Sequence, residues 1–174
     1  SGFKSLNVDL IYGLPKQSVS SFTDTVERVL ELRPDRIALY SYAHLPQRFK
    51  PQRRILDVDL PSASEKLGIL ARAIDLFNRA GYIYIGMDHF ALPDDELARA
   101  QRSGTLTRNF QGYTVGPDGD MLSFGVSAIG KVGPTYSQNA KDLPAYYDTL
   151  EQGQLPVIRG IELTADDLLR RAII

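Results

Sequence analysis

The stretch SLNVDLIYGLP (residues 5–15) is a β-rich run closed by Leu-Pro, and the same pattern recurs as RIALYSYAHLP (residues 36–46) and YIYIGMDHFALP (residues 82–93). Each copy leads, at a different distance, into a helical pattern. Strand-then-helix units in series favour a parallel sheet with right-handed crossovers. The repeat therefore predicts three consecutive parallel strands at about 6–12, 36–42 and 83–88, with helices at about 19–32 and 63–80 packed on one side.

Local signals mark where the helices begin and end. Ser62 precedes Glu65 at the spacing of a capping box, and Pro34 ends the helical stripe that starts near Val19. The segment DDELARAQRSG is acidic at its start, basic toward its end and closed by Gly104, as the helix dipole favours. We also expect a glycine-rich strand in MLSFGVSAIGKVG (residues 121–133) and a last helix in TADDLLRRAII (residues 164–174).

Length and composition limit the possible folds. The chain has 174 residues, of which 43% are hydrophobic and 24% charged, with a formal net charge of −1. These values are typical of a globular chain that can bury a core. A complete (β/α)8 barrel takes about 250 residues. We therefore expect a partial, TIM-like β/α barrel or an open sheet.

Other classes are disfavoured by what the sequence lacks. It contains no cysteine, which removes disulfides, thiolate metal sites and any iron–sulfur cluster held by this chain itself. No apolar run approaches the roughly 20 residues needed to cross a bilayer, and the near-neutral charge argues against general nucleic-acid binding. We expect a cytoplasmic protein with no membrane or nucleic-acid partner.

Polar residues gather at the predicted carboxyl ends of the strands, where α/β proteins carry their chemistry. Asp9 lies within the first strand, on the same face as Asn7 and Ile11. It is either a functional carboxylate or a paired carboxylate of the core. His44 and His89 fall just past the second and third strands, and each is either functional or a hydrogen-bonded wall residue.

A long basic loop separates His44 from Ser62, several times longer than the usual connection of about 2–6 residues. Its cations are Arg48, Lys50, Arg53 and Arg54. Most such runs are simply solvated. The alternative is a cationic rim for a ligand with several carboxylates or phosphates, because guanidinium groups bind these groups in a bidentate manner.

The segment RNFQGYT (residues 108–114) combines stacking and hydrogen-bonding groups with little aliphatic character. Phe110 offers a flat apolar face and Gln111 offers both a donor and an acceptor. In GVSAIG, Gly125 and Gly130 bracket small residues and Ile129. Glycine in a strand often marks close approach of a ligand, although packing explains it as often. Neither common nucleotide-binding fingerprint occurs.

These residues also carry a resemblance. The sequence resembles the oxygen-independent coproporphyrinogen III oxidases, radical S-adenosylmethionine (SAM) enzymes of heme and porphyrin biosynthesis, over essentially its whole length. The matching segments are NVDLIYGLPKQ, YSYAHLP, GMDHFALPDDELARAQRSGTLTRNFQGYT, GVSAIG, YSQN and RGIELTADDLLRR. GMDHFA and RNFQGYT are the most specific of them. The resemblance implies an oxidoreductase that oxidatively decarboxylates two propionates of coproporphyrinogen III to vinyl groups, giving protoporphyrinogen IX.

The resemblance also implies a set of site residues. The family encloses two SAM molecules beside a [4Fe-4S] cluster in its barrel, and an electron donor serves the cluster. The positions that match its SAM site are Asp9, Ala43, Phe110, Gln111 and Ile129. For Ile129, core packing is the competing interpretation. The four propionates of the substrate give the basic loop a ligand, and we add Arg108 to Arg48, Lys50, Arg53 and Arg54 as candidate substrate contacts.

One departure from the family pattern is informative. The CxxxCxxC loop that holds the cluster is missing, since the chain has no cysteine. We therefore interpret the chain as a piece of the enzyme that is inactive alone, with 1–162 as the C-terminal portion of the barrel domain and 163–174 as the start of a helical domain. Two alternatives stay open: a metal-dependent hydrolase that uses Asp9, His44 and His89 or Asp88, and a non-catalytic tetrapyrrole-binding module.

Overall fold

The computed structural model describes residues 2–109, 112–116 and 119–173. The chain divides into two compact units, Ser1–Val115 and Gly116–Ile174, which are described separately below. This division reflects packing within the chain. The predicted domain boundary between residues 162 and 163 is a different question and stays a prediction.

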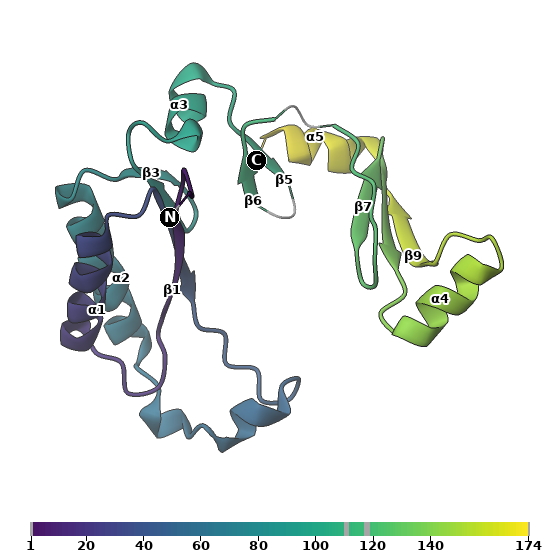
Figure 1. Cartoon of the computed structure of the whole chain (residues 1–174). Coiled ribbons are helices and arrows are strands. Elements are labelled where there is room, and N and C mark those ends of the chain that lie inside the picture. The colour runs from purple at the N-terminus through teal and green to yellow at the C-terminus, as the bar shows by residue number, and fades with distance from the viewer. Residues whose placement is uncertain (1, 110–111, 117–118, 174) are drawn as a thin grey trace. The chain divides into compact units, whose positions relative to one another are not determined.

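The first unit is built on a four-stranded sheet (Figure 1) with the strand order β1-β2-β4-β3. Its strands are β1 (Asn7–Tyr12), β2 (Arg36–Ser41), β3 (Ile83–Gly86) and β4 (His89–Ala91). β1 and β2 pair in parallel, as the repeat predicts. β4 is antiparallel to both β2 and β3, so the sheet is mixed. The predicted α/β class is confirmed. The three predicted strands correspond to β1, β2 and β3, and they run in the same direction, because β2 and β3 are both antiparallel to β4. The prediction of a purely parallel sheet is wrong, because the unpredicted strand β4 lies between β2 and β3.

The error lies in the third copy of the repeat. YIYIGMDHFA forms a tight hairpin in place of one strand, because the chain turns at Gly86 and Met87, which have φ angles of 150° and 49°. The returning strand β4 lies between β2 and β3. His89 therefore belongs to the sheet itself instead of following a strand end.

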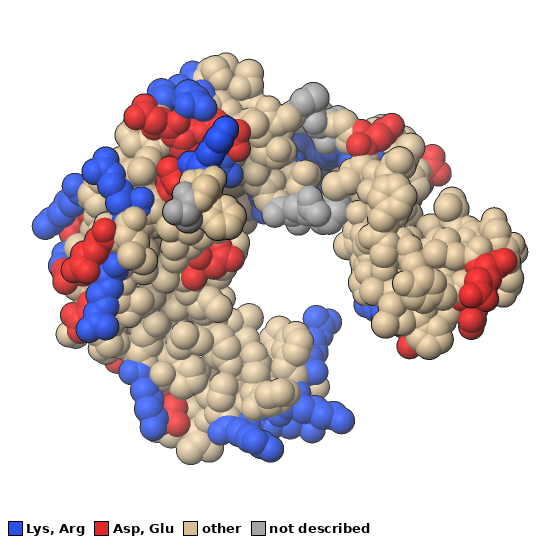
Figure 2. All heavy atoms as spheres, in the orientation of Figure 1, with Lys and Arg blue, Asp and Glu red and all other residues tan. Residues whose placement is uncertain are grey.

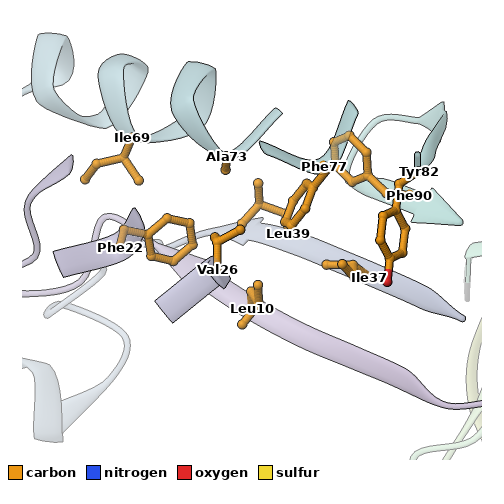
Figure 3. Close-up of a cluster of buried hydrophobic side chains, with 10 residues drawn as sticks. All are labelled: Leu10, Phe22, Val26, Ile37, Leu39, Ile69, Ala73, Phe77, Tyr82 and Phe90. Atoms are coloured by element: carbon orange, nitrogen blue, oxygen red, sulfur yellow. The ribbon is translucent and has the colours of Figure 1, made fainter. Parts of the chain in front are cut away.

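Two helices cover one face of this sheet, as predicted: α1 (Val19–Leu32) and α2 (Ala63–Arg79). In register, Leu10 of β1 pairs with Leu39 of β2, and Ile37 of β2 pairs with Phe90 of β4, which places all four side chains on the helix-covered face. Figure 3 shows the core that results. Its buried members are Leu10, Phe22, Val26, Ile37, Leu39, Ile69, Ala73, Phe77, Tyr82 and Phe90.

A third helix, α3, spans Glu96–Ser103. Asp95 caps its N-terminus, and Gly104 caps its C-terminus with a φ of 70°, the left-handed conformation that glycine favours. Arg36 ties the start of this helix to β2, with its Nε 2.8 Å from Asp95 and a second ion pair to Glu96. The helix covers a smaller apolar cluster that includes Ile85, Ala91, Leu97 and Ala98, with Tyr113 packed beside it. A short antiparallel ribbon follows, made of β5 (Thr107–Asn109) and β6 (Gly112–Thr114).

The long loop after β2 contains two short 3₁₀ turns, η1 (Lys50–Arg54) and η2 (Asp57–Asp59). The Gln52 side chain holds its entry, because Nε2 donates to the Ala43 carbonyl at 3.0 Å and Oε1 accepts from the Leu45 N–H at 2.6 Å. The loop therefore has a defined backbone path despite its length.

The second unit carries an antiparallel sheet of β7 (Ile129–Val132), β8 (Thr135–Asn139) and β9 (Val157–Glu162), with helices α4 (Leu143–Glu151) and α5 (Ala165–Ile173). The expected strand at 121–133 is correct only at its end. Residues 122–128 are not strand, and Met121 makes an isolated bridge to Lys131. Gly125 and Ser127 have positive φ angles of 94° and 61°, which a continuous strand does not permit. The expected last helix is confirmed as α5.

Within the part of the chain that the structure describes, no helix is both long enough and apolar enough to span a bilayer.

The capping box predicted for α2 is confirmed and gives a testable result. Ser62 Oγ accepts from the Glu65 N–H, and the Ser62 N–H donates to Glu65 Oε2 at 2.8 Å. Ser62→Ala is expected to lower the free energy of unfolding by about 1 kcal/mol. Denaturant titration followed by circular dichroism measures it. Ser20→Ala, at an exposed position of α1, is the matched control, and an equal loss in both variants would contradict a specific capping effect.

The same capping box predicts a pH dependence. Hydrogen bonds from Ser62 lower the pKa of Glu65 below its ordinary value. A depressed carboxyl pKa stabilises the folded state above the unfolded pKa, and this contribution disappears as the pH falls through the folded pKa. The difference between the unaltered chain and Ser62→Ala is therefore expected to shrink in acid. Denaturant titrations at neutral pH and below pH 4 measure it, and a difference that grows in acid would contradict the assignment.

Candidate functional site

The candidate site lies on the open face of the first sheet, which we define as the face opposite α1 and α2. Strand alternation places Asn7, Asp9 and Ile11 of β1 on this face, and their partners on β2 in register are Arg36, Ala38 and Tyr40. Ala38 in turn pairs with His89 of β4. Asp9, Ala38 and His89 thus form one row across three strands.

Asp9 is exposed on this face. Its Oδ1 accepts a hydrogen bond from Asn7 Nδ2 at 2.7 Å, and it forms no ion pair with the described residues. The alternative that Asp9 is a paired carboxylate of the core is therefore wrong, because the core of this unit lies on the other face. The carboxylate is available to a ligand.

His89 is held in place from three directions. Its Nδ1 lies 2.6 Å from Asp88 Oδ1. Two tyrosine rings pack against the imidazole in a T-shaped arrangement, Tyr113 at 5.5 Å between centroids and Tyr40 at 6.3 Å. The hydroxyl of Tyr113 occupies the space that Gly86 leaves, where any Cβ would clash with it. We call Asp9, Tyr40, Asp88, His89 and Tyr113 the open-face cluster.

The electrostatics of this cluster are negative. Burial, reinforced by the charges of Asp9 and Asp88, raises the pKa of Tyr40 above its ordinary value. Tyr40 therefore stays neutral over the physiological range. Arg108 places a positive charge over the Tyr113 ring, with its Cζ 5.7 Å from the centre of that ring.

His44 lies in a different setting from His89. Its Nδ1 is 3.4 Å from the Tyr42 hydroxyl, and its Nε2 is 3.6 Å from Asp57 Oδ1 in the long loop. Over residues 2–109, 112–116 and 119–173, no group of three His, Cys, Asp or Glu residues is arranged to hold a metal ion. The hydrolase alternative, which joined Asp9 to His44 and His89 or Asp88, thus gains no support from the described residues.

The long loop carries exposed cations, and Figure 2 shows Lys and Arg atoms gathered over it. Arg53 donates from Nε to the Pro46 carbonyl at 3.0 Å, which ties its side chain to the loop. The side chains of Arg48, Lys50 and Arg54 make no hydrogen bond or ion pair with any described residue. Free, unpaired cations on an ordered loop suit an anionic ligand.

The structure describes three of the five predicted SAM positions. Ala43 is exposed just after β2. Ile129 begins β7 in the second unit and is 37% exposed, whereas Phe110 and Gln111 lie outside the described residues. The prediction that all five positions line one cavity stays a prediction.

Sequence reasoning missed Tyr40 and Tyr113, although alternation from Ala38 places Tyr40 on the open face.

Comparison with known proteins defines the class. No family model matches the chain. Among solved structures, a radical SAM enzyme superposes with a TM-score of 0.93 at 55% identity, covering 99% of this chain and 40% of that one. The chain is therefore similar, in fold and in sequence, to part of a radical SAM enzyme. That enzyme is coproporphyrinogen III oxidase from Escherichia coli.

Curated relatives agree. The chain is 55% identical over 172 residues to the oxygen-independent coproporphyrinogen III oxidase of Pseudomonas aeruginosa and 50% identical over 173 residues to that of Thermostichus vulcanus. Each match covers 99% of this chain. The chain spans 37% of the Pseudomonas protein and 53% of the Thermostichus protein. The resemblance noted in the sequence is thus confirmed for a segment of these enzymes.

Proposed function

We propose that this chain is a segment of an oxygen-independent coproporphyrinogen III oxidase, which converts two propionates of coproporphyrinogen III to vinyl groups. The observation that carries the proposal is the match at 55% identity over 99% of the chain. The test is anaerobic conversion of coproporphyrinogen III to protoporphyrinogen IX by the complete enzyme. Its failure with SAM, reductant and electron acceptor supplied would refute the proposal.

The open face is suited to SAM. Asp9 offers an exposed carboxylate that can accept hydrogen bonds from ribose hydroxyls or the amino group, and Ala43 offers a small, exposed apolar surface. Phe110, Gln111 and Ile129 complete the set that the resemblance implies, for two SAM molecules in the complete enzyme. When bound and reduced, SAM supplies the radical chemistry that removes a hydrogen atom from a propionate side chain. The residues of this chain bind, orient and shield the reactants.

The [4Fe-4S] cluster does not fit the residues of this chain. Such clusters are held by cysteine thiolates, and the sequence has none. Its ligands and its electron donor must therefore come from outside these 174 residues. In this proposal, β1 and β2 with their covering helices contribute to a partial β/α barrel, and the chain alone is inactive.

The basic loop is proposed to bind the substrate's propionates. The cations with unpaired side chains are Arg48, Lys50 and Arg54. Arg53 donates a hydrogen bond from its Nε to the Pro46 carbonyl. Arg108 is a fifth candidate, near the open-face cluster. Four carboxylates on one substrate need several cations, which favours a loop over a single arginine.

Charge reversal tests the loop. Arg48→Glu combined with Arg54→Glu in the complete enzyme is expected to raise KM for coproporphyrinogen III about tenfold, because two attractive charges become repulsive. SAM affinity is expected to stay unchanged. Steady-state kinetics and SAM titration measure the two effects. Arg28→Glu, on the exposed side of α1, is the matched control. An unchanged KM in the double variant would show that the loop is a solvated surface with no role in substrate binding.

A further inference from the structure

His89 occupies a central place on the open face. It lies in the row Asp9–Ala38–His89, two strands away from Asp9. Two strand spacings separate the two backbones by about 10 Å, and the residue between them, Ala38, carries only a methyl group. A ligand bound at Asp9 is therefore close enough to contact a second ligand bound at His89.

The contacts of His89 define its tautomer. Ionised Asp88 can only accept a hydrogen bond, so the 2.6 Å contact places the proton of the neutral ring on Nδ1. Nε2 then carries a lone pair. Among the residues that the structure describes, Nε2 has no hydrogen-bond partner. The T-shaped contacts with Tyr40 and Tyr113 fix the plane of the ring, so the direction of that lone pair is set as well.

The surroundings of this lone pair favour a ligand that donates hydrogen bonds. Asp9 and Asp88 place two negative charges near Tyr40, and both raise its pKa. A carboxylate would be repelled by these charges, whereas an N–H group would be attracted. Ile11, 45% exposed in the same strand as Asp9, pairs in register with Tyr40 and adds apolar surface beside it. The cluster thus suits an apolar ligand built of small aromatic rings that carry N–H donors.

We propose that His89 Nε2 accepts a hydrogen bond from a pyrrole N–H of the tetrapyrrole substrate, with Asp88 holding His89 in the required tautomer. This inference rests on the proposed function. The reduced macrocycle offers four pyrrole N–H donors, while its propionates go to the basic loop. In this arrangement the two residues of one row have different roles. The Asp9 carboxylate binds the cofactor, and the His89 imidazole binds the substrate. His89 is a substrate-binding residue, and Asp88 is a positioning residue that acts through it.

The tautomer is tested first, in the 174-residue chain itself. The chain has only two histidines, so a long-range ¹H–¹⁵N spectrum of the imidazoles is simple, and His44→Gln assigns it. We expect His89 with Nδ1 protonated and Nε2 bare. Asp88→Ala should shift the ring toward the Nε2-protonated form. A neutral His89 protonated at Nε2 in the unaltered chain would overturn the assignment.

Substrate binding is tested in the complete enzyme with coproporphyrinogen III under anaerobic conditions. His89→Phe keeps a ring between the tyrosines but has no acceptor, and His89→Gln restores an acceptor oxygen. The Kd is expected to rise about tenfold in the Phe variant and to recover to within about threefold of the original in the Gln variant. SAM affinity is expected to be unchanged in both variants.

The outcomes separate the two proposals. If His89→Phe binds coproporphyrinogen III as tightly as the unaltered enzyme, His89 is only a packing residue and this inference fails while the proposed function stands. If the unaltered enzyme does not bind coproporphyrinogen III, the proposed function fails and the inference fails with it.

Discussion

Phe77→Ala is expected to lower the free energy of unfolding by about 3–5 kcal/mol, the range found when a fully buried phenylalanine is truncated. Phe77 is fully buried in α2, and its ring packs on Phe90 of β4 at 4.8 Å and on Tyr82 at 6.1 Å. Truncation removes both aromatic contacts and leaves a cavity between helix and sheet. Denaturant titration followed by far-ultraviolet circular dichroism measures the loss.

Leu67→Ala is the control for this prediction. It lies on the same helix, carries a side chain 66% exposed, and is expected to cost less than about 1 kcal/mol. Phe77→Leu should fall between the two, because it keeps most of the apolar volume. If Phe77→Ala cost no more than Leu67→Ala, the packing of α2 on the sheet would not be a main source of stability.

Phe110→Ala combined with Gln111→Ala is expected to reduce kcat/KM of the complete enzyme by about 30- to 1000-fold, corresponding to about 2–4 kcal/mol of productive SAM placement. The double change removes a stacking face and a directed hydrogen bond. Single-turnover and steady-state assays measure the loss of decarboxylation. Val115→Ala, at an exposed residue just after β6, is the control and should stay within about twofold of the unaltered enzyme.

The iron content of this double variant should be unchanged, because no cysteine ligand is altered. Iron analysis and the visible spectrum of the purified enzyme check this point. Near-normal decarboxylation by the variant would show that RNFQGYT has a packing role only.

The helices were predictable because their signals are local. Val19 to Pro34 contains an apolar stripe with a breaker at its end, and α1 runs Val19–Leu32 as expected. Ser62 and Glu65 specify the start of α2, and Gly104 specifies the end of α3. Each signal concerns residues within a turn or two of one another, so no tertiary contact is needed to interpret it.

The candidate site was predictable in part. Alternation correctly grouped Asn7, Asp9 and Ile11 on one face, but it did not say which face the helices would cover. Asp9 proved exposed because Leu10, Leu39 and Phe90 are the residues that pack under α1 and α2. The two histidines appeared equivalent in the repeat, yet one belongs to the sheet and the other to the loop.

The sequence by itself determined the α/β class, the helix ends, the pairing of β1 with β2 through their shared pattern, and the resemblance that the comparisons confirm. Only the tertiary structure decided that YIYIGMDHFA turns back as a hairpin and that β4 enters between β2 and β3. Strand order depends on hydrogen bonds between residues about 50 positions apart, such as Ile37 and Phe90. Periodicity along the chain does not encode that choice, and it is the choice that brings Asp88 and His89 beside Tyr40.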